Sequence, residues 1–483
     1  MATMASFMAR PLRTLIATPM VLRHSSKFTK TIKDGIKGKH PFATPETSAF
    51  YNPNHPPYQT DVVVIGGGVM GSSIAYHLKR DAEAGLNVLV VERDPTYTRA
   101  STTLSVGGIR QQFSIPANVE LSMYSVNFLK TIKEHLCVDD ADPPDVQFNQ
   151  GGYLLLASEQ GAEQMMENHR MQREYGAMVE LFTAKQLKSR FPWLNTEDVA
   201  LASYGFENEG WFDPWSLLKA FKEKALSLGA QYINGEVNGF GCVQVPRQGA
   251  EMAYYTGSGR RVKTVKIRMP NSPEVLQVQC SMVVIAAGAW SGEVAEMLDI
   301  GKGSEEDLLD VALPVVPRKR YAYVVHSPDG PVLDCPLVID NSGTYLRREG
   351  LGGNYVCGRG PPTEEEEPHT DNLQVDYEFF EEKVWPHLAH RMPCMENLKV
   401  KSAWAGYYDY NTLDQNGIIG NHPAYPNLYM ATGFSGHGIQ QAPAVGLAVS
   451  DLILHGEISA FDLSDLSFDR VMQNKPLFEK CIY

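Results

Sequence analysis

The chain has 483 residues, of which 43% are hydrophobic and 20% are charged, and its formal net charge at pH 7 is −13. These fractions are those of a folded globular protein, and the negative charge argues against a nucleic-acid-binding protein. A chain of this length exceeds the size of a single hydrophobic core, so we expect at least two subdomains.

The first 40 residues differ from the rest of the chain in charge. They contain eight Lys and Arg residues, several Ser and Thr residues, and one acid, Asp34. A basic, acid-poor start is typical of a mitochondrial transit peptide. It predicts a protein of the mitochondrial matrix and leaves peripheral association with the inner membrane open. A disordered basic arm and a helix on a membrane surface are the alternatives. Residues 41–60, rich in Pro, Asn and His, are expected to be a linker.

Residues 61–92 contain the most informative pattern in the chain. An apolar run at 62–65 predicts a buried parallel strand, and the spacing G-x-G-x-x-G follows directly. A helical stretch and a second apolar run at 88–91 come next, and an acid ends that run. The order of strand, glycine turn, helix, strand and acid predicts a dinucleotide site, whereas glycines alone are weak evidence.

Each residue of this pattern has a physical role in such a site. Gly66 permits a tight turn, Gly68 lets the backbone approach a pyrophosphate, and Gly71 lets the helix pack closely on the sheet. The helix N-terminus offers free N–H groups and a partial positive charge to the phosphates. The carboxylate of Glu92 can accept hydrogen bonds from a ribose diol.

Helices and strands alternate through the rest of the chain. Helical periodicity and capping signals predict helices over 117–135, 160–176 and 211–228. Strands are expected over 151–158, 231–237, 274–285, 398–410 and 427–431, with several short strands over 313–360. The run 361–368 holds four glutamates and is expected to be a solvated loop.

Parallel-strand signals at the start, middle and end of the chain, with antiparallel segments between them, define the expected fold. It is an α/β fold with α+β elements: a Rossmann-like dinucleotide-binding domain, assembled from discontinuous segments, with an inserted antiparallel-sheet substrate domain. The first domain takes residues 61–150, 206–300 and 411–483. The second takes residues 151–205 and 301–410.

A second glycine-rich turn precedes a helix near the end of the chain. ATGFSGHG (431–438) follows a strand and provides another place where backbone N–H groups can meet a dinucleotide. AAGAWS (286–291) is a similar strand end in the middle of the chain. The seven cysteines are scattered without C-x-x-C spacing, so neither a disulfide framework nor a metal site is expected.

These three motifs together resemble the D-amino-acid-oxidase and sarcosine-oxidase family of FAD enzymes, over about residues 60–455. The resemblance implies that the Rossmann-like domain binds FAD. It places the following residues at the cofactor: Gly66, Gly68, Gly71, Glu92 and Arg93 at the ADP part, Ser101 and Arg110 in the pyrophosphate and flavin loop, Val237 at the adenine, Gly288 and Trp290 in the AAGAWS turn, and Gly433, Phe434, Ser435, Gly436, His437, Gly438 and Ile439 at the flavin ring.

The chain departs from the family pattern at several positions. Family amine oxidases hold a substrate carboxylate with two basic side chains, where this chain has Phe113 and Gln440. The family lysine that promotes the reaction of reduced flavin with oxygen falls near Val356. Tyr407 or Tyr408 stands where some members attach FAD through cysteine. The resemblance therefore implies noncovalent FAD, and puts oxidase activity and amino-acid binding in doubt.

The candidate catalytic residues are His437, Tyr408 and Tyr410. In the family the histidine lies by the flavin, and a turn histidine satisfied by backbone is the alternative. Tyr408 and Tyr410, with Trp404 and Tyr407, offer aromatic faces to a substituted ammonium, although strand packing explains them equally well. His422, beside a proline, is expected to lie in a loop.

Two functions remain open from the sequence. One is an FAD-dependent dehydrogenase that oxidises a C–N bond of a small amine. The other rests on stretches such as SYGFENEGWFDPW and WAGYYDYNTLDQNG, which resemble part of the family almost word for word. That resemblance implies a factor required for assembling respiratory complex I, with complex I subunits or assembly intermediates as its partners. An NAD(P) dehydrogenase would explain 61–92 but not the turn at 433–438.

Overall fold

A computed structural model describes residues 55–82, 85–245, 259–270, 272–304, 307–331 and 333–480. The chain divides into two units, Met1–Gly38 and Lys39–Tyr483, and every described residue belongs to the second. The predicted transit peptide, 1–40, and most of the predicted linker, 41–60, lie outside the described residues.

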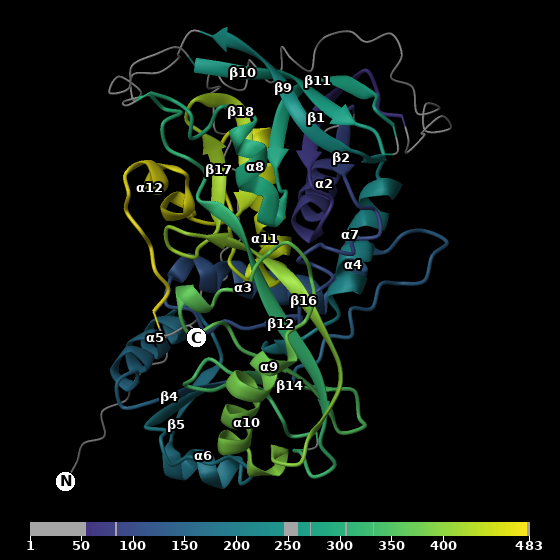
Figure 1. Cartoon of the computed structure of the whole chain (residues 1–483). Coiled ribbons are helices and arrows are strands. Elements are labelled where there is room, and N and C mark those ends of the chain that lie inside the picture. Colours follow the sequence, from purple (N-terminus) through teal and green to yellow (C-terminus); the bar gives the residue numbers. More distant parts are fainter. Residues whose placement is uncertain are drawn as a thin grey trace, which may run out of the picture. The chain divides into compact units, whose positions relative to one another are not determined.

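The first of two large sheets is built around a parallel core. Its strand order is β17-β18-β11-β1-β2-β8, and β9 and β10 extend it as antiparallel strands beside β11 (Figure 1). The parallel strands are β1 (Gln59–Ile65), β2 (Val88–Glu92), β8 (Gln231–Asn234), β11 (Val275–Ile285) and β18 (Tyr425–Thr432). The antiparallel strands are β9 (Glu236–Val245), β10 (Gly259–Arg268) and β17 (Ile418–His422). β1 pairs with β11 on one side and β2 on the other, and its apolar residues are buried on both faces: Val62 and Val64 belong to the core with α2 and α11, whereas Val63 and Ile65 belong to a second core.

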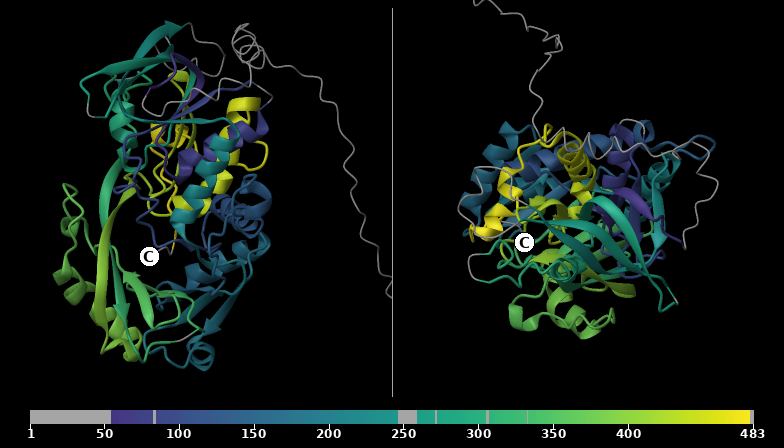
Figure 2. Two further views of the ribbon diagram at one scale, coloured as in Figure 1. Left: turned by 90° about the vertical axis from the view of Figure 1, so that its right-hand side faces the viewer. Right: turned by 90° about the horizontal axis from the view of Figure 1, so that it is seen from above.

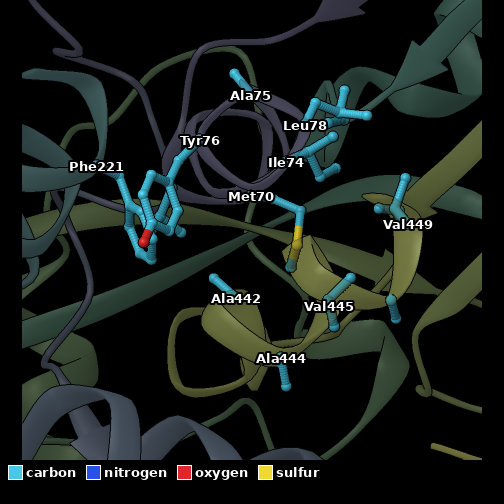
Figure 3. Packing of buried hydrophobic residues seen from close by; sticks show 14 of the residues in the cluster. Met70, Ile74, Ala75, Tyr76, Leu78, Phe221, Ala442, Ala444, Val445 and Val449 are labelled. Atoms are coloured by element: carbon cyan, nitrogen blue, oxygen red, sulfur yellow. The ribbon is translucent and has the colours of Figure 1, made fainter. Parts of the chain in front are cut away.

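Three helices pack together against this sheet. They are α2 (Val69–Asp81), α7 (Pro214–Ser227) and α11 (Gly438–His455), and they lie side by side with α2 in the middle (Figure 2). Met70 of α2 points toward Ala442 and Val445 of α11, and the Tyr76 ring lies 5.7 Å from the Phe221 ring of α7 (Figure 3). Burying apolar side chains of this size stabilises the fold by about 1.5–3 kcal/mol each.

The second sheet is mostly antiparallel. Its order is β16-β12-β15-β14-β13-β4-β6-β5, with a single parallel pairing between β13 and β4 in this order. The strands are β4 (Tyr153–Ala157), β5 (Val179–Thr183), β6 (Leu201–Gly205), β12 (Val315–His326), β13 (Leu337–Ile339), β14 (Tyr345–Glu349), β15 (Asn354–Gly358) and β16 (Lys399–Asn411). The long pair β12–β16 carries most of the residues of this sheet that line the cavity described below (Figure 1).

The remaining elements connect the sheets. They are β3 (Gly108–Ile109), β7 (Gly210–Trp211), α3 (Pro116–Lys130), α4 (Ile132–Leu136), α5 (Ala162–Glu174), α6 (Ala184–Arg190), α8 (Ser291–Glu296), α9 (Tyr377–Phe379), α10 (Trp385–Arg391) and α12 (Asp469–Met472). No helix in the described part of the chain has the length and apolar character to cross a membrane. Among those residues the cysteines are free thiols, and no group of three or more Asp, Glu, His or Cys side chains is placed so that it could bind a metal ion.

The expected α/β fold with two sheets is confirmed, and three local expectations need correction. The helix expected over 117–135 is two helices, because Thr131 ends α3 with a non-helical ψ of 22°. The strand expected over 231–237 breaks at Gly235, whose N–H donates to the Glu92 carbonyl. The run 361–368 is not simply solvated, because three of its glutamates form ion pairs with cations of the second sheet and its helices.

Candidate cofactor and substrate site

One cavity of about 670 Å³ extends between the two sheets. Its wall includes the β1–α2 turn, the ends of β2 and β11, the start of α11, and the facing residues of β12 and β16. This volume falls in the range of cofactor and small-molecule sites. The carboxyl ends of the parallel strands meet here, which is where open α/β sheets bind ligands.

The glycine turn between β1 and α2 is tightly packed. Gly66 has φ of +101°, and a Cβ atom there would overlap the carbonyl oxygen of Ala286 on the neighbouring strand. A Cβ atom on Gly71 would overlap the carbonyl oxygen of Gly66. Gly66 and Gly68 line the cavity, whereas Gly71 lies behind the turn and holds α2 against it. Both close approaches require glycine.

The N-terminus of α2 opens into the cavity. Its N-cap is Gly68, which has no side chain to cap the helix, and the Val69 N–H donates to the Thr102 hydroxyl at 3.1 Å. Ser101 and Thr102 line the same wall. A helix end without a carboxylate cap keeps its partial positive charge available, which fits a phosphate group.

The end of β2 supplies an acid that is already part of the turn. The two oxygens of Glu92 accept the N–H groups of Gly67 and Asp94, each at 2.8 Å. Burial raises the pKa of Glu92, and these N–H groups oppose the shift. Glu92 and Val237 both line the cavity, so the remaining lone pairs of the carboxylate face the position expected for a ribose.

An aromatic platform lies beside this acid. The guanidinium of Arg93 stacks 3.8 Å from the centroid of the Trp290 ring, and the ring of Tyr407 meets Trp290 edge-on at 5.6 Å. Gly288, with φ of +53°, begins the turn that carries Trp290. Arg93, Gly288, Trp290 and Tyr407 all line the cavity, so β2, β11 and β16 meet at this wall.

The second glycine-rich turn meets a carboxylate that sequence reasoning missed. The Phe434 N–H donates to the Asp409 carboxylate at 3.0 Å, and the Ser435 N–H donates to the Asp409 carbonyl at 3.2 Å. Burial raises the pKa of Asp409 to about 6, although backbone N–H groups of the turn lower it. Two of the turn's N–H groups are therefore engaged by β16. Gly436 and Gly438, nearer to α11, line the cavity.

Arg110 and His437 meet in the cavity wall. Nη2 of Arg110 lies 3.3 Å from Nε2 of His437, whose pKa is lowered to about 3 by burial and by the arginine charge. The histidine is therefore neutral and accepts from Arg110. Arg110 is 3% exposed, its Nε has no hydrogen-bond partner within the described chain, and Phe113 and Tyr153 flank its guanidinium.

The two positions that lack the family's basic residues have structural roles. Phe113 is fully buried and meets the His437 ring edge-on at 5.5 Å. The Gln440 side-chain oxygen accepts the Arg110 backbone N–H at 2.8 Å. Both residues therefore position Arg110 and His437, and neither presents a charge to the cavity.

The aromatic residues of β16 divide into two groups. The Tyr407 hydroxyl donates to the Thr370 carbonyl at 2.7 Å, and the Trp404 indole donates to the Leu104 carbonyl at 2.8 Å. Tyr408 packs against Gly436, and Tyr410 lies 5.0 Å from the guanidinium of Arg318. All four rings line the cavity, and Tyr408 is the one in contact with the glycine-rich turn.

The structure brings most of the predicted cofactor residues to this one cavity. The predicted residues in its wall are Gly66, Gly68, Glu92, Arg93, Ser101, Arg110, Val237, Gly288, Trp290, Phe434, Ser435, Gly436, His437, Gly438 and Ile439, and the candidates Tyr408 and Tyr410. Gly71 and Gly433 lie behind it. His422 is buried at the end of β17 and accepts the Ala424 N–H, outside the cavity wall.

Several residues in the wall carried no signal in the sequence. Arg320 of β12 lies 5.4 Å from the Tyr408 ring, and Tyr153 and Tyr345 come from β4 and β14. Glu367 follows β15 and forms an ion pair with Arg320. These residues are brought together by the pairing of distant strands. The alternation of aromatic residues in RYAYVVH (320–326) predicts that this segment is a strand, but it does not show which of its residues face a ligand.

The chain matches the family model described as FAD dependent oxidoreductase over residues 61–452. This match covers most of the chain, and the residues described above fit such a cofactor. The chain therefore belongs to this family of FAD-dependent oxidoreductases, as its motifs predicted.

Its relatives extend this assignment. FAD-dependent oxidoreductase domain-containing protein 1 of Xenopus laevis is 57% identical over 429 residues, which cover 88% of this chain and 85% of that protein. The protein of the same name from Bos taurus is 55% identical over 435 residues, and 89% of each chain is covered. The crystal structure of L-proline dehydrogenase from P. horikoshii matches with a TM-score of 0.70 and 28% identity, covering 87% of this chain and 100% of that one.

Proposed function

We propose that this chain holds one noncovalent FAD across the cavity and uses it to accept hydride from a carbon next to an amine nitrogen. The observation that carries the proposal is the convergence of two helix N-termini, those of α2 and α11, on one cavity. The cofactor supplies hydride acceptance, and the protein supplies binding, orientation and exclusion of water. Arg110 and neutral His437 are positioned to orient the reacting groups.

Noncovalent attachment gives the first test. Tyr407, a candidate for the position of the attaching cysteine, has its hydroxyl bonded to the Thr370 carbonyl, and Tyr408 packs against Gly436. Neither side chain is a thiol, so we expect acid precipitation of the yellow protein to leave about one flavin per chain in the supernatant. Absorbance spectra of pellet and supernatant measure this partition. Yellow colour that stays with the pellet would contradict noncovalent binding.

The substrate prediction follows from the charges in the wall. A substrate carboxylate in a site that excludes water needs a cation, because an unpaired buried charge costs several kcal/mol. Phe113 and Gln440 provide none at the two positions that the resemblance assigns to the carboxylate, and we assign Arg110, which contacts neutral His437, to the flavin. We therefore expect that sarcosine, glycine, proline and dimethylglycine do not reduce the flavin during anaerobic mixing, followed by its visible absorbance. Rapid bleaching by any of them would refute this inference.

The same experiment separates the two roles that the sequence left open. We propose that the chain acts in the mitochondrial matrix in the assembly of respiratory complex I, with complex I subunits or intermediates as partners. Two observations support this role. The stretches SYGFENEGWFDPW and WAGYYDYNTLDQNG resemble part of the family almost word for word, and Phe113 and Gln440 are uncharged. A secondary or tertiary amine that bleaches the flavin would support the amine oxidation proposed above, whereas a flavin that no amine of the panel reduces would favour an assembly factor in which FAD is a structural element. If complex I forms normally in cells that lack this chain, the assembly role is wrong.

A further inference from the structure

The acidic segment 361–368 lies against the substrate side of the cavity. Pro361, Pro362 and Thr363 line the cavity, as do Glu364 and Glu367. The segment follows β15 and continues beside β12, whose basic residues it meets. A run of glutamates has therefore become part of the wall of a binding site.

Glu367 makes the most specific of these contacts. Its two oxygens accept from Nη1 and Nη2 of Arg320 at 2.7 and 2.8 Å, a bidentate pair in which the side chains are 13% and 17% exposed. Arg318 lies 3.7 Å from the same carboxylate. Bidentate carboxylate pairing saturates one edge of a guanidinium and fixes its orientation. By contrast, the side chain of Glu364, which pairs with Arg318, is 65% exposed.

Arg320 lies in the part of the cavity wall that the second sheet contributes. It is part of the cavity wall, and its guanidinium is 5.4 Å from the ring of Tyr408. Tyr408 in turn packs against Gly436 of the glycine-rich turn. The Tyr408 ring therefore lies between the Arg320 guanidinium and the turn proposed to hold the flavin, and Arg320 is on the side of the second sheet.

Two other arginines of the cavity wall, Arg110 and Arg359, are engaged with neutral groups. Arg110 contacts His437, and Nη1 of Arg359 lies 2.8 Å from Nε2 of His387 and 3.3 Å from the Lys383 carbonyl. Neither makes an ion pair with a carboxylate in the part of the chain that the structure describes. Arg320 differs because the chain itself supplies its anion.

We propose that Glu367 occupies the place of a substrate carboxylate on Arg320, and so makes the site select amines that carry no carboxylate. This inference rests on the proposed amine-oxidising site and names its substrate class. A carboxylate ligand would have to displace a bidentate pair that is shielded from water, and would leave Glu367 with Arg318 alone. Discrimination of this kind comes from a group that disfavours the wrong ligand.

Binding of benzoate and of uncharged benzamide tests the proposal. Holoprotein is titrated with each compound, and binding is followed both by perturbation of the flavin spectrum and by equilibrium dialysis. We expect wild type to bind benzoate no better than benzamide. We expect Glu367→Gln, which frees Arg320, to bind benzoate at least tenfold more tightly than wild type while its affinity for benzamide is unchanged.

Two control variants show which cation acts. Glu366→Gln removes a neighbouring carboxylate that pairs with Lys383 outside the cavity wall, and should behave as wild type, whereas Arg320→Gln combined with Glu367→Gln should lose the gained affinity. Glu367→Ala serves in place of the glutamine variant if the latter does not fold. Equal benzoate affinity in wild type and either Glu367 variant, or a gain that survives loss of Arg320, overturns the proposal. Absence of FAD or of any reducing amine would instead contradict the proposed function, and dialysis reports benzoate binding in either case.

Discussion

Replacing Gly71 with Val should abolish FAD binding. The Cβ of any larger residue at this position overlaps the carbonyl oxygen of Gly66 and comes within 3.1 Å of Val64 on β1. The obstructing atom is backbone at the centre of the turn, so α2 must move away from the sheet. Gly66 cannot yield, because it is itself in contact with Ala286. The N-terminus of α2 would then no longer face the phosphates.

The size of this effect is clearest beside two other variants. Glu92→Ala removes charge-assisted hydrogen bonds worth about 1.5–3 kcal/mol, a loss of roughly ten- to a hundredfold in affinity. Gly352→Val is the matched control, since Gly352 is exposed and a Cβ there meets nothing within 4 Å. Flavin-to-protein ratios after gel filtration give the order, and circular dichroism checks folding. A Gly71→Val protein with its full complement of FAD would show that this turn is wrongly assigned.

The glycine turn was predictable because its determinants are local. The run of β-branched residues, the glycines and the following acid lie within 61–92, and Gly71 and Glu92 contact other residues of that segment. The structure places Gly66 and Gly71 in close backbone approaches, as the spacing implied. The turn before α11 was predictable for the same reason, since strand, glycines and helix follow one another directly.

The residues that shape the substrate side were not predictable in this way. Glu367 and Arg320 are 47 positions apart. They meet because β15 pairs with β12, and the chain after β15 continues along the same strand. Asp409 reaches the turn before α11 only through the long β16 strand. The sequence does not show what Asp409, in an aromatic strand, or Glu367, in a charged loop, will contact, because strand pairing determines the partners of both.

Buried polar contacts between segments far apart in the sequence were equally hidden. Glu209 is fully buried, and accepts the Gln111 N–H at 2.8 Å and the Gln112 side-chain amide at 2.7 Å. Burial raises the pKa of Glu209 to about 8. This carboxyl group lies beneath the loop that carries Arg110 into the cavity. The sequence marked Arg110, but the support of its loop comes from a residue about a hundred positions away.

The absence of charge at Phe113 and Gln440 was a sequence observation, and the structure changes its meaning. Sequence alone suggested an emptied carboxylate site. In the structure the Gln440 side chain accepts a hydrogen bond from the Arg110 backbone N–H, and Phe113 packs on His437, so both side chains have structural roles. Arg320 with Glu367 then supplies a neutral pair on the opposite wall. These contacts fit the proposed selection of a ligand without a carboxylate, in a wall that still holds the cations of Arg110 and Arg320.

The second large effect is expected from Asp414→Ala, which should lower the free energy of unfolding by about 3–5 kcal/mol. Asp414 is 1% exposed and accepts from Arg470 at 2.7 Å, from the Asn411 side chain at 2.9 Å and from the Leu477 N–H at 3.0 Å. Its removal leaves the Arg470 charge buried without a carboxylate. Because the Asn411 N–H donates to the Ser435 hydroxyl at 2.9 Å, the variant should also release FAD more readily.

Denaturant unfolding of four proteins tests this ion pair. Asp334→Ala breaks an exposed pair with Arg190, and should change stability by less than about 1 kcal/mol. Replacing Asp414 and Arg470 together with Met should cost less than Asp414→Ala alone, because the double variant leaves no unpaired charge in the interior. If Asp414→Ala and Asp334→Ala destabilise the protein equally, the buried pair does not anchor α12 and the C-terminal segment to the turn between β16 and β17.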